Sequence, residues 1–395
     1  ETVILQRKEN KVKKVLIATW YLGNNYGTVL QAYSLKKFLE KEEFQVFMQY
    51  PHGKETHSYH DYVATFMNKL IFRLNTKKSL RKKSDNSHKE EIEQQREKFE
   101  EFFTDVYKGK HFSITTGEKT KKAKEQIDVF ISGGDQIWNP YFLNRHMLFD
   151  YVDNDKKVIS FGTSIGVKKI PLYYKKFYRV MLSKYHFIGV REESSRIELE
   201  KITQKKVSKV VDPTLLVGIE EWNEDIKKYS RINLDDLEHD YILCYFVGDR
   251  DYWDYVKAMQ LETGYKVYIL PITQSMQEYR KDYEYIIDTS PLDFLHLIKN
   301  AKIVCTDSYH ATVFATRFMK EIYVLKRFSN KSKKSQNGRL YEYLKTIGRL
   351  DIIVNDENVF HRNINDKINN AEEYLESITN QSKELLLKEL KEDYE

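Results

Sequence analysis

The sequence has few cysteines and no long apolar run. Its two cysteines, Cys244 and Cys305, both lie in apolar segments, which excludes a disulfide-dense secreted scaffold and predicts reduced thiols in the core. No apolar stretch approaches the roughly 18 to 20 residues that span a bilayer, and no signal-peptide pattern opens the chain. We therefore expect a cytoplasmic protein. Its 395 residues, of which 41% are hydrophobic, are enough to fill two cores.

The chain has nearly equal numbers of acidic and basic residues, 59 and 65 respectively. The basic residues do not form a stripe with interleaved aromatics, so nucleic-acid binding is not expected. They do cluster at 77–83, after a segment at 60–74 whose apolar residues recur at helical spacing. We favour an ordinary amphipathic helix with a solvated basic loop. The alternative is contact with an anionic membrane surface.

The most informative segment is 15–39, which reads as a buried strand, a glycine-bearing turn and a helix. Gly23 and Gly27 permit a tight turn or a close backbone approach, and the start of the following helix would favour an anionic ligand. The spacing matches neither the dinucleotide-binding fingerprint nor a P-loop. Alone, the segment predicts only the first βα unit of an open α/β sheet.

Apolar strands alternate with helical patterns along most of the chain, which predicts parallel sheets with crossover helices. We expect two doubly wound, Rossmann-like domains that face each other across a cleft, the arrangement called GT-B. The first would span 11–205, with a basic and helical insertion at about 60–125 in which 89–101 forms an exposed helix. The second would span 206–368, and 369–395 would form a helix on the surface or crossing back to the first domain.

Five short polar blocks follow predicted strands, where ligands of open α/β sheets bind. In the one-letter code they are NYGTVLQ (25–31), GDQIWN (134–139), REES (191–194), DPT (212–214) and DSYH (307–310). In this order and at these spacings the blocks resemble the polysaccharide pyruvyl transferase family, from about Val15 to about Gly348. Enzymes of that family move the enolpyruvyl part of phosphoenolpyruvate onto a sugar to make a pyruvate ketal.

The resemblance implies a donor site for phosphoenolpyruvate. The carboxylate and phosphate of this donor need cationic or helix-terminal partners. Ketal formation also needs an acid–base group that works near neutral pH, a task suited to histidine. The family pattern places donor binding on Arg191, Ser308, His310, Lys326 and Arg339, and a catalytic role on His310 and Arg191.

The sequence leaves a structural alternative for the histidine. His310 opens a helix directly after a strand, where such a side chain often bonds to a loop, and Asp307 and Ser308 could both cap that helix. Ala311 stands where the family usually has glycine. The methyl group leaves less room for a phosphate close to the backbone, which puts direct amide contact in doubt.

The cationic residues have alternatives as well. Arg191 could form an ion pair with Glu192 or Glu193, although the planar guanidinium fork suits both oxyanions of the donor. Arg339 could equally cap a helix or bridge the domains. Lys326 follows the last predicted strand at a position that is cationic in the family, and it competes for this role with Arg327, Lys331, Lys333 and Lys334.

The acceptor side is expected on the first domain. Asp135 could act as the base for the sugar hydroxyl or could cap its own turn. Trp138 could stack on a sugar or lie in the core. The predicted acceptor-binding residues are Asn25, Tyr26, Gln31, Gln136 and Trp138.

No histidine, cysteine or carboxylate set has metal-ligand spacing, so we expect no metal and no cofactor. The predicted function is a ketal-forming transferase of cell-surface polysaccharide biosynthesis, with phosphoenolpyruvate and a saccharide as partners. A lipid-linked acceptor would make contact with the inner face of the membrane useful. Two alternatives stay open: a glycosyltransferase of the same architecture with a nucleotide-sugar donor, and a non-catalytic saccharide- or membrane-binding protein.

Overall fold

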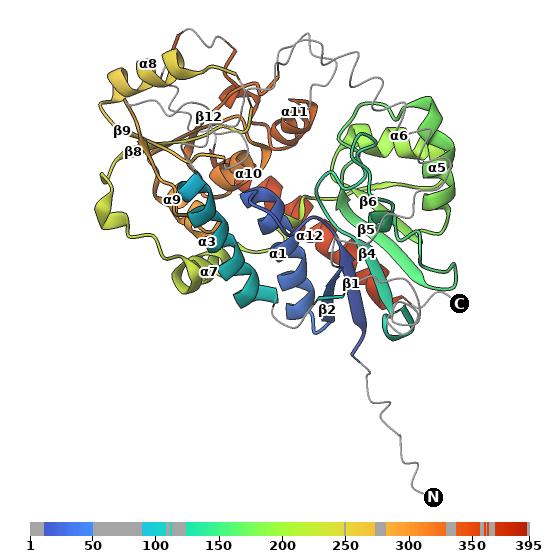
Figure 1. Cartoon of the computed structure of the whole chain (residues 1–395). Coiled ribbons are helices and arrows are strands. Elements are labelled where there is room, and N and C mark those ends of the chain that lie inside the picture. The colour runs from blue at the N-terminus through green and yellow to red at the C-terminus, as the bar shows by residue number, and fades with distance from the viewer. Residues whose placement is uncertain are drawn as a thin grey trace, which may run out of the picture.

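A computed structural model describes residues 12–49, 89–107, 111–112, 124–248, 250–272, 282–328, 337–355, 359–360, 362 and 368–392. The basic cluster at 77–83 and the apolar segment before it lie outside the described residues, as do Lys331, Lys333 and Lys334. The described part forms two parallel α/β sheets with helices packed around them (Figure 1).

The N-terminal sheet has the strand order β3-β2-β1-β4-β5-β6-β7, and every pairing in it is parallel. Its central strands are apolar on both faces because helices and loops cover both sides of the sheet. The last strand carries the sheet slightly past the predicted boundary at 205, because a two-residue strand leaves no apolar run in the sequence. The strands are β1 (Lys14–Ala18), β2 (Gln45–Gln49), β3 (His111–Phe112), β4 (Val129–Ser132), β5 (Lys157–Thr163), β6 (Phe187–Val190) and β7 (Ser208–Lys209).

The C-terminal sheet has the order β10-β9-β8-β11-β12, again with parallel pairings only. Two parallel sheets confirm the predicted α/β fold with two doubly wound domains. The thiols of Cys244 and Cys305 are buried and free on adjacent strands, as predicted. The strands are β8 (Tyr241–Tyr245), β9 (Lys266–Ile269), β10 (Glu284–Tyr285), β11 (Ile303–Thr306) and β12 (Glu321–Val324).

Helices connect the strands and cover the sheets. They are α1 (Tyr26–Lys41), α3 (Lys89–Tyr107), α5 (Leu172–Ser183), α6 (Glu193–Thr203), α7 (Ile219–Tyr229), α8 (Trp253–Thr263), α9 (Pro291–Asn300), α10 (Tyr309–Arg317), α11 (Asn337–Thr346) and α12 (Ile368–Lys391). Short 3₁₀ turns are η2 (Arg145–Leu148), η3 (Pro213–Leu215), η4 (Leu234–Asp236) and η5 (Leu350–Ile352). Within the described ranges, no helix combines the length and the apolar character needed to cross a bilayer.

Helix α1 lies where the two domains meet and is buried along most of its length. The Tyr26 ring stacks on Phe294 of α9 with 4.7 Å between the ring centroids, and its hydroxyl hydrogen-bonds Thr289 at 2.5 Å. On the next turns, Lys37 pairs with Asp225 of α7 at 2.5 Å. The first helix of the N-terminal domain is therefore fixed by residues of the second half of the chain.

Helix α3 differs from the exposed helix expected at 89–101. It continues to Tyr107, and Phe99, Phe102 and Tyr107 are buried in the same core as α1. The charged residues at its start cover only the outer face, while the aromatic residues that follow form an inner face at helical spacing.

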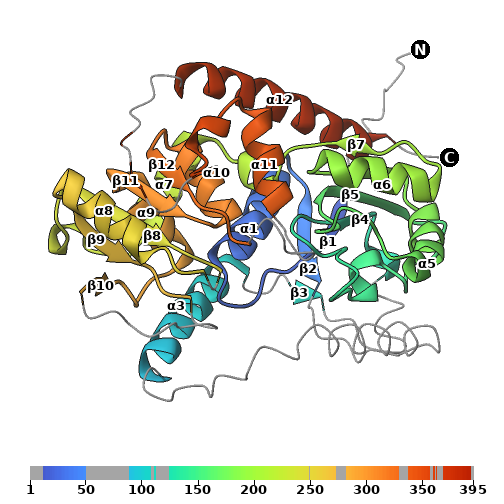
Figure 2. The same ribbon diagram turned by 90° about the horizontal axis from the view of Figure 1, so that it is seen from above.

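Helix α12 spans the molecule and returns to the N-terminal domain (Figure 2). The Lys13 ammonium donates to the Leu390 carbonyl at 3.2 Å, and the Val211 amide donates to the Ser382 hydroxyl at 3.2 Å. The C-terminal segment thus crosses back to the first domain, which is the second of its two predicted placements, and it contacts both domains.

Candidate active site

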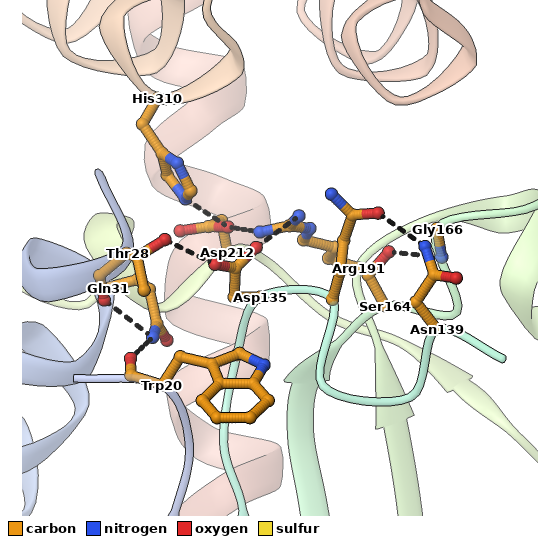
Figure 3. A network of polar contacts seen from close by, with 12 residues as sticks. Trp20, Thr28, Gln31, Asp135, Asn139, Ser164, Gly166, Arg191, Asp212 and His310 are labelled. Carbon is orange, nitrogen blue, oxygen red and sulfur yellow. Dashed lines mark hydrogen bonds and ion pairs between the residues drawn. The ribbon is translucent and has the colours of Figure 1, made fainter. Parts of the chain in front are cut away.

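Polar side chains from both domains meet where β4 and β6 end and α10 begins (Figure 3). At the centre is Arg191, the residue after β6, whose side chain is only 1% exposed. Its Nη1 donates to Asp212 Oδ2 at 2.5 Å, and its Nε donates to Glu192 Oε1 at 2.8 Å. Its Nη2 lies 3.7 Å from Asp135 Oδ1. Three carboxylates therefore surround one buried guanidinium.

The carboxylate of Asp212 joins this arginine to the histidine of the other domain. Oδ2 of Asp212 lies 3.7 Å from Nε2 of His310, and Oδ1 accepts from the backbone amide and hydroxyl of Thr214 at 3.0 and 2.7 Å. Burial alone would raise the pKa of Asp212, but Arg191 and His310 outweigh it and lower that pKa. Asp212 is thus held as a carboxylate against the imidazole.

His310 is positioned by its own helix and by the N-terminus of α1. Ser308 is the N-cap of α10, and its hydroxyl accepts from the Ala311 amide at 3.4 Å. The Ala311 methyl group is fully buried in the core. Ser308 therefore takes the capping role that the sequence left open, and its contact with the donor stays a prediction.

Gly27 in the first turn of α1 has the imidazole directly against it. A Cβ on Gly27 would lie 2.2 Å from Nδ1 and 2.3 Å from Cγ of His310. No side chain fits at this distance, so glycine here lets the two domains close with the histidine between them. The sequence suggested that another group comes close to the backbone at Gly27, and in the structure that group is the His310 side chain.

This contact predicts that substitutions at Gly27 and His310 have coupled effects on stability. Gly27→Ala should lower the free energy of unfolding by about 1–3 kcal/mol, because the added methyl group overpacks the interface. In a His310→Ala background the same change should be neutral or stabilising, since the ring is gone and alanine is the better helix former. Urea denaturation of the four proteins measures the coupling.

The control for this cycle is Gly338→Ala, which adds a methyl group in the first turn of α11, where nothing lies within 4 Å. It should leave stability unchanged or raise it slightly, because alanine is the better helix former. An equal loss from Gly27→Ala with and without the imidazole would contradict the close approach.

Asp135 lies in the turn after β4 with a φ of 65°. One carboxylate oxygen accepts from the Thr28 hydroxyl at 2.7 Å, and the Asp135 carbonyl accepts from the Ser164 amide at 2.9 Å. Burial would raise the pKa of Asp135, but Arg191 and His310 dominate and lower it. A carboxylate with a lowered pKa is a weak base, so this electrostatic setting favours an orienting role; the predicted base function stays untested.

Three of the predicted acceptor residues lie near the network around Arg191. Asn25 is exposed and caps α1 by accepting from the Thr28 amide at 3.1 Å. The buried amide of Gln31 donates to the Trp20 carbonyl at 3.0 Å (Figure 3), and Gln136 Oε1 accepts from Asn139 at 3.0 Å. These contacts fix the loops after β1 and β4, and a role in acceptor binding stays a prediction for all three.

The two aromatic residues expected on the acceptor side are buried. Tyr26 packs between α3 and α9, as described above, and also receives a hydrogen bond from the Gln95 amide. Trp138 is fully buried, with its ring edge-on to Tyr185 at 5.4 Å. Their placement favours structural roles, which for Trp138 was the stated alternative.

Arg339 opens α11 and faces the network from the C-terminal domain. Its guanidinium carbon lies 5.8 Å from the ring of Tyr309, the same ring that Arg191 approaches to 4.6 Å. Burial, reinforced by repulsion from Arg191, lowers the pKa of Arg339 to about 10. Arg339 therefore stays charged near neutral pH.

Lys326 lies after β12, as predicted. Its carbonyl oxygen accepts from Arg250 at 2.7 Å and from the Tyr252 hydroxyl at 3.0 Å. Its side chain lines neither of the two cavities beside the network. The structure thus places Lys326 at the edge of this region, and its contact with the donor stays a prediction.

Two cavities flank Arg339. One of about 270 Å³ is lined by Arg191, Asp212 and Tyr309, and residues of α12 form another part of its wall. The other, of about 290 Å³, lies between α6, α11 and the loop before α5. Glu192, Arg339 and Glu342 line both cavities. The two cavities therefore share one part of their walls.

The carboxylate of Glu342 ties these elements together across the domain boundary. Its Oε2 accepts from the backbone amides of Glu193 at 2.6 Å and Ser194 at 3.3 Å, at the N-terminus of α6. Helix α11, which carries Arg339, is thereby docked on the helix that follows Arg191.

Sequence reasoning missed Asp212, Glu342 and Thr28 as members of the network, whereas Glu192 was named as an alternative partner of Arg191 and the structure shows that ion pair. Asp212 offered a signal, because an aspartate before proline and threonine is a turn-capping pattern that follows an apolar run. Glu342 offered none, since its partners are remote in the sequence. Among the residues that the structure describes, no group of three or more His, Cys, Asp and Glu side chains could hold a metal ion.

Comparison with known proteins identifies a protein family. The family model described as polysaccharide pyruvyl transferase matches residues 25–327. No curated protein gives a significant match.

Solved structures of similar shape include UDP-N-acetylglucosamine 2-epimerase from Rickettsia bellii, at 12% identity, covering 95% of this chain and 98% of that chain with a TM-score of 0.44. The corresponding enzyme from Neisseria meningitidis, bound to UDP-GlcNAc, has 11% identity, 96% and 99% coverage and a TM-score of 0.44. A glycosyltransferase from Rickettsia africae has 12% identity, 97% and 100% coverage and a TM-score of 0.46. At these values the likeness carries no argument about activity.

Proposed function

The chain belongs to the polysaccharide pyruvyl transferase family, and we propose that it transfers the pyruvyl group of phosphoenolpyruvate to a saccharide of a cell-surface polymer precursor. Family membership supports a transferase that acts on polysaccharide. The observation that carries the finer proposal is the buried array of His310, Asp212 and Arg191, with Arg339 beside it at the junction of two cavities. Arg191, Asp212 and Arg339 line the first cavity, whereas His310 lines neither cavity and lies behind Asp212, 3.7 Å from its carboxylate.

The donor fits the cavity of about 270 Å³, where Arg339 and Arg191 both contribute to the wall. Phosphoenolpyruvate brings a carboxylate and a phosphate, and guanidinium groups bind both through paired hydrogen bonds. Arg339 lines both cavities and Arg191 only one, so Arg339 is the better candidate for the direct contact. Arg191 then acts chiefly as a positioning residue that holds Asp212 and Asp135 in place.

The reaction needs one proton delivered to carbon. A sugar hydroxyl attacks C2 of phosphoenolpyruvate while the methylene carbon C3 takes a proton and becomes a methyl group. Phosphate leaves from C2, a second hydroxyl of the sugar closes the ring, and both hydroxyl protons are released to bases or water. We assign the protonation to the imidazolium of His310, which the Asp212 carboxylate orients and stabilises.

The acceptor fits the second cavity, of about 290 Å³. Ser194 and Ser195 supply hydroxyl groups to its wall, and Lys168 and Lys169 lie at the loop before α5. A saccharide needs such polar partners, and the lysines would favour an acceptor that carries an anionic group. The acceptor thus lies next to Arg339 and within reach of the donor.

A ligand screen by thermal shift tests the donor class. Phosphoenolpyruvate at 100 times its dissociation constant should stabilise the protein by about 2.7 kcal/mol through mass action, and nucleotide sugars should have little effect. Inorganic phosphate and pyruvate serve as partial-ligand controls and should each stabilise less. Stabilisation by a nucleotide sugar alone would instead identify a glycosyltransferase, and no response to either donor would favour a non-catalytic binding protein.

A further inference from the structure

Helix α5 presents an apolar face to solvent. Leu172 is 84% exposed, and Tyr173 and Val180 are exposed as well. Tyr173 and Val180 are seven residues apart and so lie on one side of the helix, with the exposed Lys176 between them. A surface helix normally turns polar residues outward, so this face needs an explanation.

A neighbouring loop extends the apolar face. Tyr141 and Phe142, which follow β4, are both about half exposed. The Tyr178 hydroxyl of α5 donates to the Trp138 carbonyl at 2.5 Å, which holds this loop against the helix. The two segments therefore form one patch. We define the α5 surface by its apolar members and its exposed lysines, which are Tyr141, Phe142, Leu172, Tyr173, Val180, Lys168, Lys169 and Lys176.

The segment that carries most of the α5 surface has charges of one sign, whereas the neighbouring α6 carries Glu193, Glu198 and Glu200. No aspartate or glutamate occurs from Lys156 to Arg191, whereas nine lysines and arginines do. Lys175 is paired with Glu198 at 3.5 Å, and Arg179 donates to the Ile202 carbonyl at 2.9 Å. The other lysines of the α5 surface are exposed to solvent.

The α5 surface also has a defined position. Figures 1 and 2 both place α5 on the outer flank of the N-terminal domain, away from the C-terminal domain. Lys168 and Lys169 belong to the wall of the cavity of about 290 Å³ as well. The patch therefore begins at the mouth of that cavity and runs outward along the helix.

We propose that the α5 surface docks on an anionic lipid bilayer. Exposed tyrosine, leucine and valine side chains can enter the headgroup region, and the lysines around them are attracted to acidic lipids. Complementary charge together with exposed apolar side chains is the combination that a peripheral membrane surface requires. A docked enzyme would hold the second cavity near the membrane, where a lipid-linked saccharide could reach it. The docking itself does not depend on the proposed reaction.

Vesicle co-sedimentation tests the proposal without donor or acceptor. The full-length protein should sediment with vesicles of phosphatidylcholine and phosphatidylglycerol, and it should detach as salt rises, because exposed charges are screened over about 10 Å at 0.1 M. The double variant Leu172→Ser, Val180→Ser should weaken the partition coefficient by on the order of tenfold or more, since two apolar side chains no longer leave water. Lys168→Gln, Lys169→Gln and Lys176→Gln should each weaken it about fivefold.

Leu261→Ser is the matched control, because Leu261 is 76% exposed but lies on α8 of the other domain. It should bind vesicles as the unmodified protein does, and circular dichroism should show every variant folded. Equal binding to neutral vesicles, an equal loss in the Leu261 control, or unchanged binding of the α5 variants would overturn the proposal. So would complete loss on neutralising only the basic cluster at 77–83. Failure of the pyruvyl transfer assay would leave this result unaffected.

Discussion

His310→Gln should lower the turnover number by a factor of about 100 or more, with a smaller effect on donor affinity. Glutamine keeps a hydrogen-bonding group of similar reach near Asp212 but cannot carry the proton that C3 of phosphoenolpyruvate must receive. Acid–base groups typically contribute about 100- to 10,000-fold, so the loss should fall on the chemical step. Phosphate release in the presence of an acceptor measures turnover, and calorimetry measures donor binding.

His296→Gln provides the matched control. His296 is a histidine of the same domain, on α9, with a hydrogen bond between Nδ1 and Ser230 at 2.9 Å. Its replacement should leave turnover near the unmodified value. If His310→Gln also turned over at a near-native rate, the imidazole would be a structural group, and proton transfer would pass to another residue, with Asp135 next in line.

Arg191→Ala should lower the free energy of unfolding by about 3–5 kcal/mol, because it leaves buried carboxylates without their cation. Asp212 and Glu192 both lose a hydrogen-bonded partner, and the Asp135 carboxylate loses a nearby positive charge. Urea denaturation at neutral pH measures the change. An arginine that only clamped the donor could be removed with little effect on stability, whereas burial among three carboxylates argues the opposite.

Arg196→Ala is the control for that experiment. Arg196 pairs with Glu193 and Glu200 on the surface of α6, where an ion pair contributes less than about 1 kcal/mol. A similar loss in both variants, or no loss in Arg191→Ala, would show that Arg191 does not hold the network together. Arg191→Lys should recover part of the stability but not the geometry, since an ammonium cannot bridge several carboxylates as a planar fork does.

Local patterns in the sequence were sufficient for the fold. The apolar runs that became β1, β4, β8 and β11 and the helical patterns between them predicted two parallel sheets, because each signal is carried by neighbouring residues. The same logic placed Arg191, Asp135 and His310 at the ends of strands. Ends of parallel strands gather at one edge of a sheet, so the proximity of Arg191 and Asp135 followed from topology. His310 follows a strand of the other sheet, and its place beside them depends on how the two domains meet.

Contacts between remote segments were not predictable in this way. Nothing near Gly27 indicates that an imidazole from residue 310 fills the space beside it, and nothing near Tyr26 indicates that Phe294 covers its ring. The sequence does not predict that apolar residues of α5 are exposed, for the same reason. The sequence of α5 would also suit a helix packed against a neighbour. Burial depends on which remote surfaces meet, and a single sequence does not specify that.

Analysis of the reaction product tests the central claim most directly. The enzyme is incubated in D₂O with phosphoenolpyruvate and a panel of glycosides that have free hydroxyl pairs, and products are examined by mass spectrometry and ³¹P NMR. We predict a glycoside heavier by phosphoenolpyruvate less phosphoric acid, one phosphate released for each ketal, and one deuterium in the new methyl group. Transfer of a sugar from a nucleotide donor, with phosphoenolpyruvate left intact, would contradict the account.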